Sequence, residues 1–284
     1  MTSGDALTCR LAVANVHRDP DASSEVVTQA RLGDTATESG TATAGWRRVR
    51  FTHDGYEGWI AADAVTAGSW PPADRPVLRA RNLFVHVHAE PSVRAPLLVC
   101  APLGTALVRR DAPGRDDGST PWIAVAAPGG LVGFAAAGDL VPEAAAWPWA
   151  AEGDLRAGVV REALNLIGLP YRWGGTTPYG FDCSGLVQCL YRLHGLILPR
   201  DVKLMVRDPR LSPIERDAVI SSDLLVFGQA AHVGMAISGK AFVHATTRLS
   251  PVVQISAIDD PHWAGIRDGC WRVRPERGSP GVLG

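Results

Sequence analysis

The sequence predicts two all-β segments followed by an α+β domain. Short apolar runs broken by Gly, Pro and Asp fill roughly the first 145 residues, as in chains of short strands. Motifs recur within this half, and apolar residues take helical spacing only after Ala151. A length of 284 residues, with 46% hydrophobic and 20% charged residues, is typical of a globular protein of two or three domains.

The N-terminal half contains an internal repeat. His17-Arg18-Asp19-Pro20 matches a second motif that begins at His88, and Gly33 matches Gly104; both pairs are 71 positions apart. The runs GWRRV and YEGWIAADAV then match PWIAV and LVGFAAAGDL at offsets of 75 or 76. A proline turn, a glycine turn, Gly-Trp-x-x-Val and Gly-Trp in this order resemble the bacterial SH3-like module.

The resemblance predicts two all-β SH3-like barrels, over residues 1–70 and 71–148, ahead of a third domain over 149–284. The proline-rich run GSWPPADRP links the two copies. The second copy is interpreted as a small barrel that positions another part of the protein. A more active role is expected for the first.

The third domain is predicted to be helical first and β afterwards. DLRAGVVREALNLIGLP has helical spacing, with Asp154 as the expected N-cap and Gly168 as the stop. A second helix is expected to begin near Cys183 and to end at Gly195. The runs DLLVFG, HVGMAI, AFVHA and CWRVR have the pattern of strands.

Cys183 is a candidate nucleophile because it stands at the start of the second helix. Unpaired N–H groups and the helix dipole stabilise negative charge there, so we expect a lowered thiol pKa. The same N–H groups can accept a developing oxyanion. Cys189, six residues later, points elsewhere on the helix and is interpreted as a core residue.

Two histidines are candidates for the base and for the group that orients it. His232 opens HVGMAI, and His244 lies twelve residues later in AFVHA. An antiparallel hairpin turning at Ser238-Gly239-Lys240 would place both at one end of adjacent strands. A lone strand histidine is usually a satisfied core residue, and this interpretation is kept for the other six, His17, His53, His86, His88, His194 and His262.

The C-terminal motifs resemble the NlpC/P60 family of papain-like cysteine peptidases. Tyr-x-Trp-Gly-Gly, Asp-Cys-Ser-Gly-Leu-Val, Pro-Arg-Asp and His-Val-Gly occur together and in order over about 155–275. The family cleaves bacterial cell-wall peptides, commonly between γ-D-glutamate and a diamino acid. The resemblance implies a papain-like α+β fold with Cys183 as nucleophile, His232 as general base and acid, and His244 as third polar residue. It places Tyr171 near the oxyanion.

Two SH3-like modules before such a domain resemble γ-D-glutamyl-L-diamino acid endopeptidases, which recycle wall fragments. The resemblance implies that an acid and a tyrosine of the first module, with the aspartate before the nucleophile, hold the free amine of an N-terminal L-alanine. These roles fall on Glu25, Tyr56 and Asp182, and Ser184 joins them as a substrate-binding residue. Alternatively, Glu25 is a solvated carboxylate, Tyr56 a packing residue and Asp182 a helix N-cap.

Composition excludes several classes of protein. A net charge of −1 gives no nucleic-acid footprint, and no run of about 18 apolar residues predicts a membrane span. The five cysteines lack zinc-site or disulfide spacing, so no metal or other cofactor is expected. Reduced thiols and the absence of a signal-like start favour the cytoplasm, unless a leader has been removed. The oligomeric state and the identity of the diamino acid stay open.

Three functional hypotheses remain. The first is a cysteine endopeptidase that forms an acyl-enzyme on murein peptides such as L-Ala-γ-D-Glu-diamino acid. The second uses the same Cys-His chemistry in an amidase or acyltransferase. The third is a protein that binds wall peptide without turnover.

Overall fold

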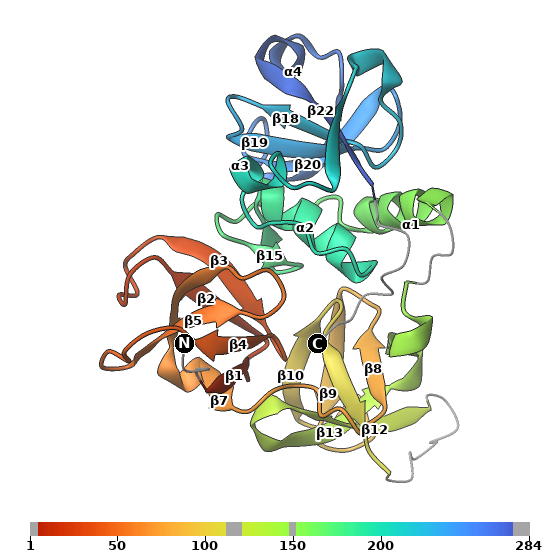
Figure 1. The fold of residues 1–284 in the computed structure, drawn as a ribbon. Helices are drawn as coiled ribbons and strands as arrows, with labels where there is room; N and C mark the ends of the chain where they lie inside the picture. Colours follow the sequence, from red (N-terminus) through yellow and green to blue (C-terminus); the bar gives the residue numbers. More distant parts are fainter. Residues whose placement is uncertain (1–4, 112–120, 148–151, 275–284) are drawn as a thin grey trace. The chain divides into compact units, whose positions relative to one another are not determined.

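The computed structural model describes residues 5–111, 121–147 and 152–274 (Figure 1). The chain divides into two compact units, Met1–Ala146 and Trp147–Gly284. The described part of the first unit is built from strands and short 3-10 turns. All four α-helices of the described residues belong to the second unit.

The first unit contains two seven-stranded sheets. The first has the order β3-β2-β6-β5-β4-β1-β7 and the second β10-β9-β13-β12-β11-β8-β14. Each strand of the second sheet therefore takes the place of the strand seven numbers earlier. The strands of the first sheet are β1 Ala6–Cys9, β2 Val13–His17, β3 Val26–Arg31, β4 Thr35–Glu38, β5 Trp46–Phe51, β6 Glu57–Ala61 and β7 Val65–Ala67. Those of the second are β8 Val77–Ala80, β9 Phe84–His88, β10 Leu97–Pro102, β11 Ala106–Arg109, β12 Trp122–Ala127, β13 Leu131–Ala136 and β14 Leu140–Pro142.

The matched histidines His17 and His88 make equivalent contacts in the two sheets. His17 Nδ1 lies 3.1 Å from the Ser24 carbonyl oxygen, and His88 Nδ1 lies 2.9 Å from the Ala95 carbonyl oxygen. The two imidazoles each meet a tryptophan edge to face, at centroid distances of 5.3 and 5.8 Å. These two histidines are satisfied structural residues, as expected.

The matched glycines Gly33 and Gly104 both have a positive φ, of 87° and 79°. L side chains rarely adopt this conformation, so the repeat keeps glycine at both turns. Each sheet packs its own apolar core. One forms around residues such as Val16, Val49 and Ile60, and the other around residues such as Val85 and Leu107.

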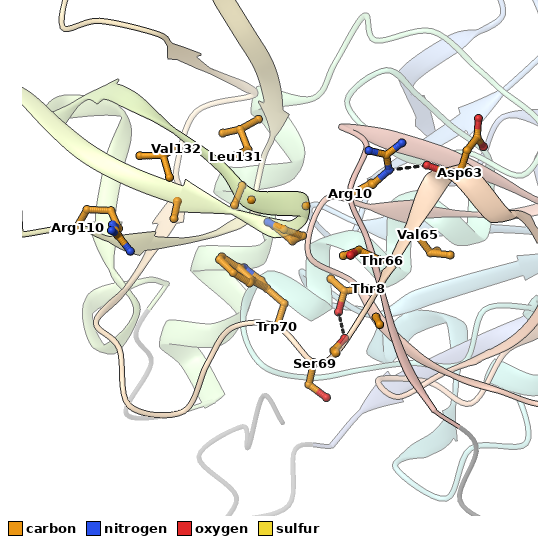
Figure 2. A pocket seen from close by; sticks show the side chains of 17 residues that line it. Thr8, Arg10, Asp63, Val65, Thr66, Ser69, Trp70, Arg110, Leu131 and Val132 are labelled. Atoms are coloured by element: carbon orange, nitrogen blue, oxygen red, sulfur yellow. Dashed lines mark hydrogen bonds between the residues drawn. The ribbon is translucent and has the colours of Figure 1, made fainter.

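Side chains also join the two sheets of this unit. The Trp70 indole Nε1 donates to the Ala106 carbonyl at 3.0 Å, and the Arg31 guanidinium donates to the Leu103 carbonyl at 2.9 Å. Beside Trp70 lies an open cavity of about 630 Å³, with Arg10 and Arg110 on its walls (Figure 2). The linker residue Trp70 thus joins the two sheets through its hydrogen bond to Ala106.

The second unit is an α+β domain around one antiparallel sheet, with the order β17-β22-β18-β19-β20-β21. Its strands are β17 Leu211–Ile214, β18 Leu224–Phe227, β19 His232–Ala236, β20 Ala241–Thr246, β21 Val252–Ala257 and β22 Arg267–Val273, with a separate ribbon of β15 Thr176–Thr177 and β16 Gly180–Phe181. Its helices are α1 Glu152–Asn165, α2 Cys183–Leu193, α3 Val202–Met205 and α4 Pro261–Ile266. Helix α2 packs against β19 and β20, and it is buried along most of its length.

The predicted elements of this unit are largely present. Helix α2 begins at Cys183, and the expected hairpin joins β19 to β20. The N-cap prediction for Asp154 is wrong: α1 already includes Glu152, so Asp154 lies in its first turn, where a carboxylate favours the helix dipole. Strand β21 was not among the predicted strands.

Candidate active site

Cys183 is the first residue of α2 and is 9% exposed. Asp182 precedes it in an extended conformation and accepts the Gly185 N–H at 2.7 Å, which makes Asp182 the N-cap. The helix therefore begins at the cysteine because an aspartate satisfies one of the first unpaired N–H groups.

Two glycines let the first turn of α2 approach the preceding loop. The Asp182 N–H donates to the Gly175 carbonyl at 3.1 Å. A Cβ on Gly185 would overlap this carbonyl oxygen, and a Cβ on Gly175 would overlap the Gly180 carbonyl oxygen. Gly175 of Trp-Gly-Gly and Gly185 of Asp-Cys-Ser-Gly are thus required because the backbone passes too close at each position for a side chain.

The carboxylate of Asp182 is the centre of a buried polar network. Arg200, which is 2% exposed, donates to its two oxygens at 3.1 and 2.5 Å, and the Gly174 N–H donates to Oδ2 at 3.0 Å. Arg200 also donates to Ser184 Oγ at 2.7 Å. Sequence reasoning missed Arg200, although it lies in the Pro-Arg-Asp motif. A buried carboxylate needs such a cation.

Burial, with a smaller contribution from the charge of Asp182, raises the pKa of the Cys183 thiol to about 11. The Val233 and Ser184 N–H groups and Arg200 lower the pKa, but by less than burial raises it. The expectation of a lowered thiol pKa is therefore wrong for this state, because desolvation outweighs the helix N-terminus. The Val233 contact also shows that the thiol lies beside the start of β19.

The two candidate histidines meet at the same end of β19 and β20. His232 Nε2 lies 2.8 Å from His244 Nδ1. On the other side of its ring, His244 Nε2 lies 3.0 Å from Ser256 Oγ. Ser256 was missed because its strand, β21, was not predicted.

An aromatic shell surrounds the histidine pair. The Trp263 indole stacks on His232 at 5.1 Å and 22°, and Phe242 lies 4.6 Å from the His244 ring. Burial in this shell lowers the pKa of His232 to about 4 and that of His244 to about 3. Both imidazoles are therefore neutral at pH 7, which is the form that can accept a proton.

Tyr171 lies in the electrostatic neighbourhood of the thiol. Burial raises the pKa of its hydroxyl to about 12, and the charges of Cys183 and Asp182 raise it as well. Its backbone N–H donates to the Pro251 carbonyl at 2.7 Å. The second unit thus gathers Tyr171, Asp182, Cys183 and Ser184 around the start of α2.

Similarity to known proteins identifies the family. Residues 168–272 match the NlpC/P60 family, and residues 16–65 match the bacterial dipeptidyl-peptidase Sh3 domain. Dipeptidyl-peptidase 6 of Lysinibacillus sphaericus is 30% identical over 256 residues, which are 88% of this chain and 90% of that protein. The chain belongs to the NlpC/P60 family.

Two further similarities support this NlpC/P60 assignment. The crystal structure of an NlpC/P60 family protein from Bacillus cereus ATCC 10987 matches 95% of this chain and 100% of its own, with a TM-score of 0.79 at 19% identity. The γ-D-glutamyl-L-lysine dipeptidyl-peptidase of the same organism is 31% identical over 123 residues, which are 41% of this chain and 36% of that protein. The C-terminal unit is thus an NlpC/P60 peptidase domain, preceded by an all-β region.

Glu25 and Tyr56 of this NlpC/P60 chain belong to the first unit. The Arg18 guanidinium donates twice to the Glu25 carboxylate, at 2.8 and 2.5 Å. The hydrogen bond to Glu25 raises the pKa of Arg18, and Tyr56 adds a smaller contribution in the same direction. Glu25 and Tyr56 therefore both lie close enough to Arg18 to affect its pKa. Arg18 was not among the predicted site residues.

Residues 5–111, 121–147 and 152–274 contain no group of three or more His, Cys, Asp or Glu side chains placed to hold a metal ion. Within the same ranges, no helix is long and apolar enough to cross a membrane.

Proposed function

We propose that this NlpC/P60 chain is a cysteine endopeptidase of murein peptides. The bond cleaved is that between γ-D-glutamate and the following L-diamino acid. The observation that carries the proposal is the His232–His244 pair, whose ring nitrogens lie 2.8 Å apart. The backbone N–H of Val233, the residue after His232, hydrogen bonds to Cys183. The similarity to a γ-D-glutamyl-L-lysine dipeptidyl-peptidase supports the choice of bond.

The reaction begins with a neutral thiol and a neutral imidazole. His232 Nε2 is hydrogen-bonded to His244, so the other ring nitrogen, Nδ1, takes the proton of the Cys183 thiol. The sulfur attacks the γ-carbonyl carbon of D-glutamate, and the negative oxygen is held by N–H groups at the start of α2 with Tyr171 nearby. The His232 imidazolium then gives its proton to the leaving amine, which leaves a thioester on Cys183. Water, deprotonated by His232, attacks the thioester and releases the γ-D-glutamyl acid and the thiol.

We propose that Glu25 and Tyr56 of the first unit and Asp182 of the second bind the free amine of an N-terminal L-alanine and so select the substrate. An ammonium ion in a closed site needs carboxylate partners. Glu25 and Asp182 already pair with Arg18 and Arg200, so the substrate amine would share these carboxylates with the two guanidinium groups. We also propose that each sheet of the first unit is one SH3-like barrel. The cleavage reaction is proposed to take place in the cytoplasm.

A digest read by mass spectrometry tests the proposal. The reduced enzyme is incubated at neutral pH with L-Ala-γ-D-Glu-meso-diaminopimelate and with its N-acetylated twin, and Cys183→Ala serves as the inactive control. Release of L-Ala-D-Glu from the free-amine peptide alone is the expected result. Equal cleavage of both peptides would refute the amine-binding roles of Glu25, Tyr56 and Asp182 but keep the peptidase. Cleavage of neither would refute the proposed function.

A further inference from the structure

A third polar side chain continues the line formed by the two histidines. Ser256 Oγ lies 3.0 Å from His244 Nε2, while His244 Nδ1 faces His232. The register explains this contact: His244 pairs with Gln254 across β20 and β21, so Ser256 is its diagonal neighbour on the same face. His232, His244 and Ser256 therefore form one hydrogen-bonded line across three adjacent strands.

The charged state of His232 fixes the direction of every bond in this line. An imidazolium carries a proton on both nitrogens, so its Nε2–H must donate to His244 Nδ1. A neutral His244 that accepts at Nδ1 must carry its own proton on Nε2. That N–H then needs an acceptor, and Ser256 Oγ is the oxygen within reach.

The surroundings make this acceptor important. His244 is fully buried, with Phe242 and Trp263 against its ring. A buried N–H without a partner is costly, and a neutral His244 has no negative charge with which to hold the imidazolium. Hydrogen bonds aligned along this line can stabilise the imidazolium in place of a negative charge.

We propose that Ser256 is a positioning residue that holds His244 in the tautomer and orientation in which His232 can carry a positive charge. Ser256 acts through His244 and does not reach the reacting atoms. This inference rests on the proposed function for its kinetic effect, but not for its effect on the tautomer.

The test compares Ser256→Val with Ser256→Thr. Both side chains are β-branched and suit a strand, and they differ only in a methyl group against a hydroxyl. We expect Ser256→Val to lower kcat by about 10- to 100-fold with KM nearly unchanged, and Ser256→Thr to retain most of the wild-type kcat. Thermal unfolding of both variants checks that the fold is kept.

A second readout does not depend on turnover. In ¹⁵N-histidine NMR spectra of the resting protein at pH 7, His244 should be protonated at Nε2 in the wild type and in Ser256→Thr, and should shift toward a mixture of tautomers in Ser256→Val. Wild-type kcat together with an unchanged His244 tautomer in Ser256→Val would overturn the inference. If the wild type cleaves no peptide, the proposed function fails, and the NMR spectra alone then decide the role of Ser256.

Discussion

Burial sets the protonation states of Cys183 and His232. It raises the pKa of Cys183 to about 11 and lowers that of His232 to about 4. Between these values the thiol keeps its proton, and the neutral imidazole has one protonated nitrogen and one that is free to accept. The resting site thus holds a neutral thiol and a neutral imidazole, and in the proposed reaction the thiolate forms when His232 takes the proton during attack.

This state predicts how Cys183 reacts with iodoacetamide. Because the thiolate fraction grows about tenfold per pH unit below the pKa, the alkylation rate should rise steadily from pH 6 to pH 10. A preformed thiolate–imidazolium pair would instead give a rate that is flat over this range. The rate is measured by tandem mass spectrometry on fragment ions that separate Cys183 from Cys189, because no Lys or Arg lies between these two cysteines.

At the scale of the element, the start of α2 is defined by backbone contact rather than by side-chain packing. The helix turn that carries Cys183 rests on the carbonyl of Gly175, and the Asp182 cap ties it to Gly174 and Arg200. An atom added between the turn and the loop would overlap the backbone and shift the turn that carries Cys183.

Gly185→Ala tests this arrangement. The added methyl group would overlap the Gly175 carbonyl oxygen, which we expect to destabilise the fold by about 1–3 kcal/mol and to lower kcat by shifting Cys183. Urea denaturation and peptide turnover measure the two effects. Gly265→Ala is the matched control, because an added Cβ there meets no atom within 4 Å. Equal stability and kcat for the two variants would contradict the contact.

Sequence patterns predicted the parts of this domain that local chemistry determines. A helix was expected to begin near Cys183, where α2 begins, and the short hairpin placed the two histidines at one end of adjacent strands. Ser256 was missed because its strand β21 was not predicted, and Arg200 because no local pattern shows that it folds back onto Asp182, 18 residues earlier. The pKa of Cys183 was predicted in the wrong direction, since the helix dipole is visible in a sequence and the depth of burial is not.

At the scale of the whole molecule, buried histidines couple folding to pH. Burial lowers the pKa of His194 and His232 to about 4 and that of His244 to about 3, against an ordinary value of 6.5. Between about pH 6.5 and pH 4 the unfolded chain binds protons at these rings and the folded chain does not. Stability should therefore fall as the pH falls through this window.

Urea denaturation at pH 7.5, 6.0 and 5.0 measures this effect. Each of these histidines contributes a slope of up to about 1.4 kcal/mol per pH unit below pH 6.5. His244→Asn removes one of the titrating groups, so its free energy of unfolding should depend less steeply on pH than that of the wild type. Parallel curves for the two proteins would show that His244 does not titrate on unfolding.

The position of β22 in its sheet has a consequence for synthesis on the ribosome. This strand, Arg267–Val273, comes last among the described strands, yet it lies between β17 and β18. The catalytic sheet therefore cannot close while the chain is still being translated through this segment, whereas the strands of the first unit are all complete by Pro142. Once β14 has left the ribosome, every described strand of the first unit has its sheet partners, whereas the sheet that carries His232 and His244 is complete only after β22 has emerged.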